Sequence, residues 1–126
     1  PSPAADRTGG AAVISRVYQM LGIATKAGKT RSGSYLAEDA VRSRKARLVL
    51  IAEDAEGNTR KRLEDKCRFY QVPVQYYGTK ADLGKSMGQG IRSCVAVTDA
   101  GLADRIAMLA EMQREERGND GEDENQ

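Results

Sequence analysis

Residues 26–34 carry the side chains whose chemistry stands out first in this sequence. The segment reads KAGKTRSGS; its cations are Lys26, Lys29 and Arg31, and its glycines are Gly28 and Gly33. Lysine and arginine hold phosphates by charge, and glycine lets a charged backbone approach closely. This composition predicts a contact with phosphate groups, either of a nucleotide or of a nucleic acid.

A phosphate-binding loop of the nucleotide triphosphatase type is the first alternative. Such a loop has four residues between its first glycine and the Gly-Lys pair, and it runs from a strand into a helix. Here five residues separate Gly22 from Gly28, and the residues before Gly22 have helical spacing. The spacing therefore disfavours a nucleotide site.

Other catalytic chemistry has little support. Glu53 and Asp54 follow an apolar run, where α/β proteins often carry sites, but a loop-capping role is favoured because adjacent residues of an extended chain point oppositely. The sequence has no histidine, and Cys67 and Cys94 lie outside any Cys-x-x-Cys spacing. These facts argue against His-dependent triads and most zinc sites. We predict a non-enzymatic protein with no metal, no cofactor and two buried, reduced thiols.

The distribution of charge indicates a polyanionic partner. Residues 111–126 carry seven acidic and two basic side chains, whereas residues 1–110 carry eleven acidic and eighteen basic ones, a formal charge of +7. A basic body attracts nucleic acid, with simple solvation of the surface as the alternative. No apolar run approaches the roughly 20 residues that cross a bilayer, and PSPAADRTGG lacks the order of a secretory signal. We expect a cytoplasmic protein with no membrane partner.

Periodic patterns predict one α/β domain, a three-layer α/β/α sandwich with a small mixed sheet of about four strands. Helices are expected before Gly22 or Gly28, from a cap at Ser34, from a cap at Asn58 or Thr59, after Thr79 and after Asp99; strands are expected near residues 29–32, 46–52, 72–78 and 94–99. The predicted boundaries are a flexible tail at 1–10, the domain at 11–111 and an acidic tail at 112–126. The helix near residue 111 is expected to fray into that tail.

Four segments, in this order, resemble the bacterial YlxQ-like branch of the L7Ae ribosomal protein family, whose members bind kink-turn RNA. The segments are LGIATKAGKTRSG, AVRSRKARLVLIAEDAEGNTRKRLEDKC, VPVQYYGTKADLGKSMG and CVAVTDAGLADRI, and together they cover roughly residues 12–107. The resemblance implies an α/β/α sandwich, a non-enzymatic cytoplasmic protein, and structured RNA, including ribosomal RNA, as the partner.

The resemblance also implies an RNA surface built from three segments: the loop at 26–33 with the following helix start, the helix start at 58–62, and the loop at 88–94. The helix expected to start near Asn58 carries cations in its first turn, which oppose its dipole. A bound anion would relieve that cost. The predicted RNA-binding residues are Lys26, Gly28, Lys29, Arg31, Gly33, Ser34, Tyr35, Asn58, Arg60, Lys61, Ile91 and Arg92.

Three positions depart from the reading motif of the family. RNA-binding members carry Asn-Glu and then Lys three residues further, where this chain has Tyr35, Leu36 and Asp39. Tyr35 can stack on an unpaired base or pack on its own helix, and Leu36 is expected in the core. Ile91 is either an apolar RNA contact or part of a flexible loop. Two functions therefore stay open: an RNA-binding module, or a protein-interaction or ribosome-associated member that has lost specific kink-turn recognition.

Overall fold

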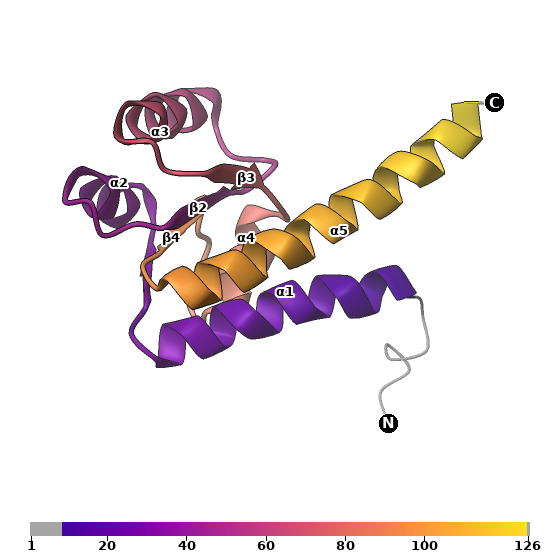
Figure 1. Cartoon of the computed structure of the whole chain (residues 1–126), viewed down its shortest axis with the longest axis horizontal. Coiled ribbons are helices and arrows are strands. Elements are labelled where there is room, and N and C mark those ends of the chain that lie inside the picture. The colour runs from indigo at the N-terminus through magenta and orange to yellow at the C-terminus, as the bar shows by residue number, and fades with distance from the viewer. Residues whose placement is uncertain (1–8, 126) are drawn as a thin grey trace.

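A four-stranded sheet lies between two layers of helices. The computed structural model describes the backbone of residues 9–125 and the side chains of residues 16–113. Its elements are α1 (Gly9–Lys26), β1 (Thr30–Ser32), α2 (Ser34–Arg42), β2 (Leu48–Ile51), α3 (Gly57–Tyr70), β3 (Val74–Tyr76), α4 (Lys80–Ser86), β4 (Cys94–Val97) and α5 (Ala100–Asn125). Figure 1 shows α1 and α5 on one side of the sheet and α2 and α3 on the other. The predicted three-layer sandwich is confirmed.

The sheet is mixed, with the strand order β1-β4-β2-β3. β4 runs antiparallel to both β1 and β2, and β2 runs parallel to β3. The register pairs Leu48 with Val97 and Ile51 with Cys94. We call these two ends of the sheet the Leu48 end and the Ile51 end. The pairing of β1 with β4 sets Ser32 opposite Val95, so β1 also ends at the Ile51 end.

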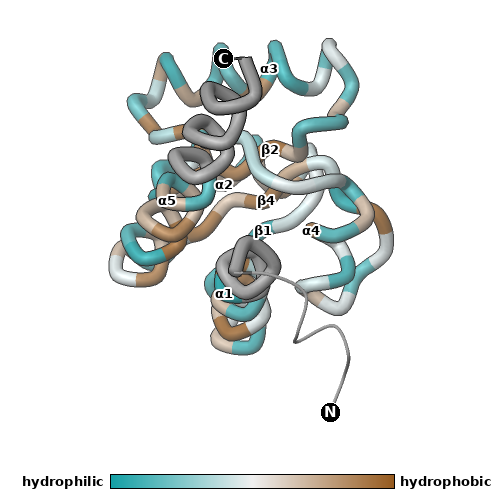
Figure 2. The backbone as a smooth tube through the Cα atoms, turned by 90° about the vertical axis from the view of Figure 1, so that its right-hand side faces the viewer, coloured by the Kyte–Doolittle hydropathy of each residue, from teal (hydrophilic) through white to brown (hydrophobic). Residues whose placement is uncertain are grey.

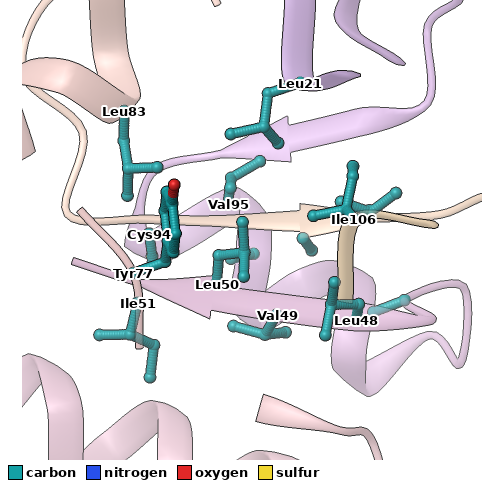
Figure 3. Close-up of a cluster of buried hydrophobic side chains, with 14 of the residues drawn as sticks. Leu21, Leu48, Val49, Leu50, Ile51, Tyr77, Leu83, Cys94, Val95 and Ile106 are labelled. Atoms are coloured by element: carbon teal, nitrogen blue, oxygen red, sulfur yellow. The ribbon is translucent and has the colours of Figure 1, made fainter. Parts of the chain in front are cut away.

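The core is aliphatic and surrounds β2 and β4, of which every residue is buried. Figure 3 shows Leu21, Leu83 and Ile106 on one face of the sheet, while Val49 and Ile51 point to the other face. In Figure 2 the hydrophobic stretches of β2 and β4 lie between α3 and α1. Strands buried on both faces read as continuous apolar runs, which is why the sequence around β2 predicted a central strand.

Two of the predicted helix caps are present and two are not. Thr79 accepts a hydrogen bond from the amide of Asp82 at 3.1 Å, and Asp99 accepts one from Leu102 at 2.9 Å. Ser34 is the first helical residue of α2, so the prediction that it caps the helix was wrong; the cap is Gly33, with a φ of 94°. Only glycine adopts this conformation at low cost.

Helix α3 begins earlier than the pattern suggested, because Glu56 precedes its first turn as the N-cap. Asn58 and Thr59 therefore lie inside the helix, and the side-chain oxygen of Asn58 accepts a bond from the amide of Thr59 at 2.9 Å. Local sequence favoured an Asx or Thr cap, but the chain leaving β2 enters the helix two residues sooner.

The two termini extend beyond the predicted domain boundaries. Helix α5 continues past Glu111 to Asn125, and residues 111–117 are all good helix formers without proline. Helix α1 begins at Gly9, and the rest of the predicted N-terminal tail, residues 1–8, lies outside the described part. Among the described helices none is both long enough and apolar enough to cross a membrane.

The two cysteines behave as the sequence predicted: both are free and buried. Burial raises the pKa of Cys67 and of Cys94 from 9.0 to about 11.

We expect neither thiol to react with iodoacetamide at pH 8 until the protein is unfolded, as followed by mass spectrometry. The same shift keeps the free energy of unfolding constant below the unfolded pKa and lowers it as the pH rises from 9 toward 11. Rapid alkylation of the native protein would contradict this burial.

Candidate nucleic-acid interface

Backbone hydrogen bonds join three distant segments at the Ile51 end of the sheet. The amide of Gly33 donates to the carbonyl of Cys94 at 2.9 Å, and the amide of Ala52 donates to the carbonyl of Ser93 at 2.8 Å. The first bond ties the start of α2 to the start of β4, and the second ties the end of β2 to the same place. The start of α2, the loop at 88–93 and the chain entering α3 therefore meet here.

Arg92 is held at the junction of β1 and α2. Its Nε donates to the hydroxyl of Ser32 at 3.2 Å, its Nη2 donates to Oε1 of Gln89 at 3.1 Å, and its Nη1 donates to the carbonyl of Ile91 at 3.0 Å. A guanidinium has five N–H donors, so two remain available. None of the three partners is a carboxylate. The positive charge is thus positioned and not neutralised, which suits a phosphate oxygen.

The start of α2 adds backbone donors beside this arginine. Gly33 caps the helix without a side chain, and no side-chain hydrogen bond satisfies the first turn. The first amides of an α-helix have no partner within the helix, and its dipole favours an anion there. A methyl group placed on Gly33 would lie 3.9 Å from Cδ of Arg92. The helix start and the guanidinium therefore border the same small region of surface.

Three apolar side chains lie exposed at this end. Tyr35 is 76% exposed, Ile91 68% and Leu36 46%. The prediction that Leu36 belongs to the core was wrong, because α2 buries Ala37, Ala40 and Val41 and Leu36 lies one position beside that face. The exposure of Tyr35 leaves most of its ring free of its own helix. These side chains lie next to Arg92 and the start of α2, where they are available for stacking and apolar contact.

The cations at the start of α3 have different surroundings. The guanidinium of Arg60 lies over the ring of Tyr76, 5.3 Å from its centroid. Nζ of Lys61 lies 3.7 Å from a carboxylate oxygen of Asp65, and the lysine side chain is 80% exposed. These contacts leave both cations on the surface, so they form a flank of the interface.

Glu38 links α2 to α3 and was missed by the sequence analysis. Its carboxylate lies 3.3 Å from Nε of Arg62 and 4.0 Å from Nη1 of Arg42, and its side chain is only 13% exposed. The ion pair joins the two helices that border the interface. The spacing of four residues between Glu38 and Arg42 was the available signal, but the cross-helix partner has no local signature.

The acidic side chains of Asp54 and Glu56 lie between the start of α3 and the start of α4. Oδ1 of Asp54 accepts a hydrogen bond from the amide of Lys80 at 2.8 Å, as expected for a loop-capping residue. Nζ of Lys80 donates to Glu56 at 3.2 Å, and this bond lowers the pKa of the Glu56 carboxyl below its ordinary value. These carboxylates disfavour phosphates on that side, so the suitable region for an anion is the α2 start with Arg92.

Four of the predicted residues lie elsewhere. The amide of Thr98 donates to the carbonyl of Lys29 at 2.8 Å, which places Lys29, with Lys26 and Gly28 just before it, at the Leu48 end. Arg31 lies on β1, and its Nη1 donates to the carbonyls of Thr30 at 3.0 Å and Gly28 at 3.5 Å. The structure brings together Gly33, Ser34, Tyr35, Ile91 and Arg92, and it places Asn58, Arg60 and Lys61 on the adjoining flank.

The three layers and the basic Ile51 end define a small α/β/α domain with a surface suited to anions. The model of the ribosomal protein L7Ae/L30e/S12e/Gadd45 family matches residues 15–107. The chain belongs to this family. The match covers nearly the whole predicted domain and leaves the acidic end of α5 outside.

Relatives and solved structures agree with this assignment. The RNA-binding protein YlxQ of Bacillus subtilis strain 168 is 42% identical over 92 residues, covering 73% of this chain and 92% of that protein. A solved structure of a protein of unknown function from Bacillus halodurans C is 34% identical, with a TM-score of 0.73, and covers 75% of this chain and 96% of its own.

A second solved structure, the Giardia lamblia 15.5kD RNA binding protein, has a TM-score of 0.69 at 20% identity and covers 90% of this chain and 99% of its own; at that identity the likeness shows the fold alone. The predicted resemblance to the YlxQ-like branch is confirmed. The protein is accordingly a non-enzymatic member of its family.

Gly84 connects the packing of α4 to the interface. A methyl group at this buried position would collide with the backbone carbonyl of Gly90 in the loop at 88–93, whereas a methyl group on Gly90 itself would meet nothing within 4 Å. We expect Gly84→Ala to lower the free energy of unfolding by about 1–3 kcal/mol and to displace Arg92. Urea denaturation measures the first effect, with Gly90→Ala as the matched control. Equal stability of the two variants would contradict the close approach.

Proposed function

We propose that the protein binds structured RNA at the Ile51 end of its sheet. Arg92 and the first amides of α2 hold backbone phosphates, and Tyr35 and Ile91 contact an unstacked base beside them. The observation that carries the proposal is the position of Arg92, fixed by three hydrogen bonds and without a carboxylate partner among them. The relative named as an RNA-binding protein supports RNA as the anion.

Recognition of the RNA relies on stacking and charge in this proposal. Tyr35 and Leu36 lack the amide and carboxylate of the family motif, and both are exposed. The carboxylate of Asp39 lies 3.3 Å from Nη2 of Arg42, so its repulsion of phosphate is partly offset. Phosphate contacts give affinity without base choice, and stacking tolerates any base. We therefore expect selectivity for a kink-turn over other structured RNAs to be modest, and we place the protein in the cytoplasm.

A protein or ribosome-bound partner is the second candidate function. The exposed Tyr35, Leu36 and Ile91 lie at one end of the sheet, and clustered apolar side chains on a surface mark contacts with macromolecules. In a family of ribosomal proteins, such a surface suits a ribonucleoprotein with both RNA and protein components. RNA remains the preferred partner because two N–H donors of the Arg92 guanidinium are available for a phosphate.

Binding to a kink-turn RNA, a simple duplex and a single strand, each at several salt concentrations, tests the proposal. We expect Arg92→Gln to weaken binding of the structured RNAs about tenfold and to reduce the salt slope by about one, since one phosphate contact is lost. Arg105→Gln, which removes an exposed cation of α5, is the control for general charge. Equal effects of the two substitutions would reject the assigned surface.

The contribution of stacking is tested separately with Tyr35→Ala. We expect this variant to bind about 5- to 150-fold more weakly, corresponding to about 1–3 kcal/mol per stacked base. Its salt slope should equal that of the unchanged protein, because no charge is removed. Unchanged affinity would show that Tyr35 faces solvent in the complex. Persistent selectivity for the kink-turn at high salt would instead show that base recognition survives without the family motif.

A further inference from the structure

A second basic surface lies at the Leu48 end of the sheet, opposite the candidate interface. Here the connection from α2 to β2 faces the connection from α3 to β3 across a hollow of about 260 Å³. Arg44 and Arg47 contribute from the first connection, and Tyr70, Gln71 and Pro73 contribute from the second. No acidic residue is among its lining residues. The hollow is therefore positively charged and open to solvent.

The cations of this surface lack the ion pairs that neutralise their neighbours. Arg44, Lys45 and Arg47 are exposed, and within the described side chains no carboxylate comes within ion-pair distance of them. By contrast, Arg42 pairs with Asp39 and Arg68 pairs with Asp65. Three adjacent charges of one sign repel one another. A bound polyanion would remove this repulsion.

Two residues that line the hollow have a left-handed backbone conformation. Arg44 has a φ of 65° and Gln71 a φ of 61°, and these are the two non-glycine residues with positive φ in the described chain. Both line the hollow. Gln71 is the C-cap of α3 and Arg44 directly follows the C-cap of α2, so both residues end helices in the left-handed conformation that is common at such positions. The guanidinium of Arg44 also lies over the ring of Tyr70, 5.4 Å from its centroid, which limits where it can point.

More cations extend this surface along the same end of the sheet. The amide of Arg47 donates to the carbonyl of Val97 at 2.7 Å, and the amide of Thr98 donates to the carbonyl of Lys29 at 2.8 Å. Lys29 and Arg47 thus lie on either side of the end of β4, two strand spacings or about 10 Å apart. Lys26, at the end of α1, is close to Lys29 in sequence. Lys26 and Lys29 therefore lie at the same end of the sheet as the hollow, together with Asp99, whose Oδ2 accepts a hydrogen bond from the amide of Leu102 at 2.9 Å.

We propose that this Leu48 end is a second RNA contact, in which Arg44 and Arg47 hold one backbone phosphate in the hollow and Lys29 and Lys45 contact others. The inference rests on RNA being the ligand of the proposed function. The chemistry of the hollow is that of a phosphate group, and the extended row of cations favours RNA over a free phosphate as its source. Residues 47–52 span about 17 Å at 3.3 Å per residue. The two surfaces therefore touch different segments of a bound RNA.

The test uses the full chain and the double variant Arg44→Gly/Arg47→Gln. Glycine at position 44 removes the cation and adopts the left-handed backbone conformation without cost. We therefore expect no loss of stability from this substitution in thermal denaturation. Gln71→Gly is the matched control, because it makes the same backbone change at the same hollow without loss of charge. Binding is measured to a short kink-turn hairpin and to the same hairpin extended by a long duplex, at several salt concentrations.

We expect the double variant to bind the extended RNA 10- to 100-fold more weakly and to reduce its salt slope by about one, because the two arginines together hold one backbone phosphate. Binding of the short hairpin should change little, and Gln71→Gly should match the unchanged protein. The double variant binding the extended RNA normally, while Tyr35→Ala weakens both RNAs, would overturn the second surface and leave the proposed function intact. Failure of the unchanged protein to bind either RNA would overturn both.

Titration with inorganic phosphate distinguishes the source of the phosphate. If the hollow is a site for a free phosphate, inorganic phosphate will raise the melting temperature of the unchanged protein but not that of the double variant, and the RNA affinities of the two will be equal. That result would overturn the assignment to RNA. Equal responses of the two proteins to phosphate, with unequal RNA affinities, would support it.

Discussion

The antiparallel pairing of β2 with β4 is the constraint on which the rest of the structure depends. Its register places Ile51 opposite Cys94, and this brings the end of one central strand to the start of the other. The bond from Ala52 to Ser93 continues this pairing, and the bond from Gly33 to Cys94 continues the pairing of β1 with β4. Together the two pairings place the loop at 88–93 beside the start of α2, where Arg92 reaches Ser32.

Local patterns of sequence predicted most of the elements but not the grouping of the site residues. Apolar periodicity identified the helices and strands, since burial imposes it wherever an element packs. The prediction that Leu36 is buried was wrong, because Leu36 is one residue before the buried Ala37 on α2 and lies beside the buried face. Lys29 and Gly33 are close in sequence, yet β1 carries them to opposite ends of the sheet. Only the strand register, which is a long-range property, could have divided the predicted residues into two groups.

The ion pairs divide the basic residues into structural and available ones. Arg62 is engaged with the largely buried Glu38 and helps to hold α2 against α3. Arg92, in contrast, is positioned by hydroxyl, amide and carbonyl groups that leave its charge intact. The total charge in the sequence could not make this distinction, because it counts both kinds alike. We propose that RNA binds to the basic residues whose charge is not neutralised, and that these lie at both ends of the sheet.

Mapping amide chemical shifts during titration with a kink-turn hairpin tests the central claim most directly. The nitrogen–proton spectrum of the full chain reports every backbone amide except those of proline. We expect the largest shifts at Gly33 to Leu36 and in the loop at 88–93, before any change at the outer faces of α1 and α5. Shifts confined to α1 and α5, with the α2 start unchanged at saturation, would contradict an RNA interface at the Ile51 end.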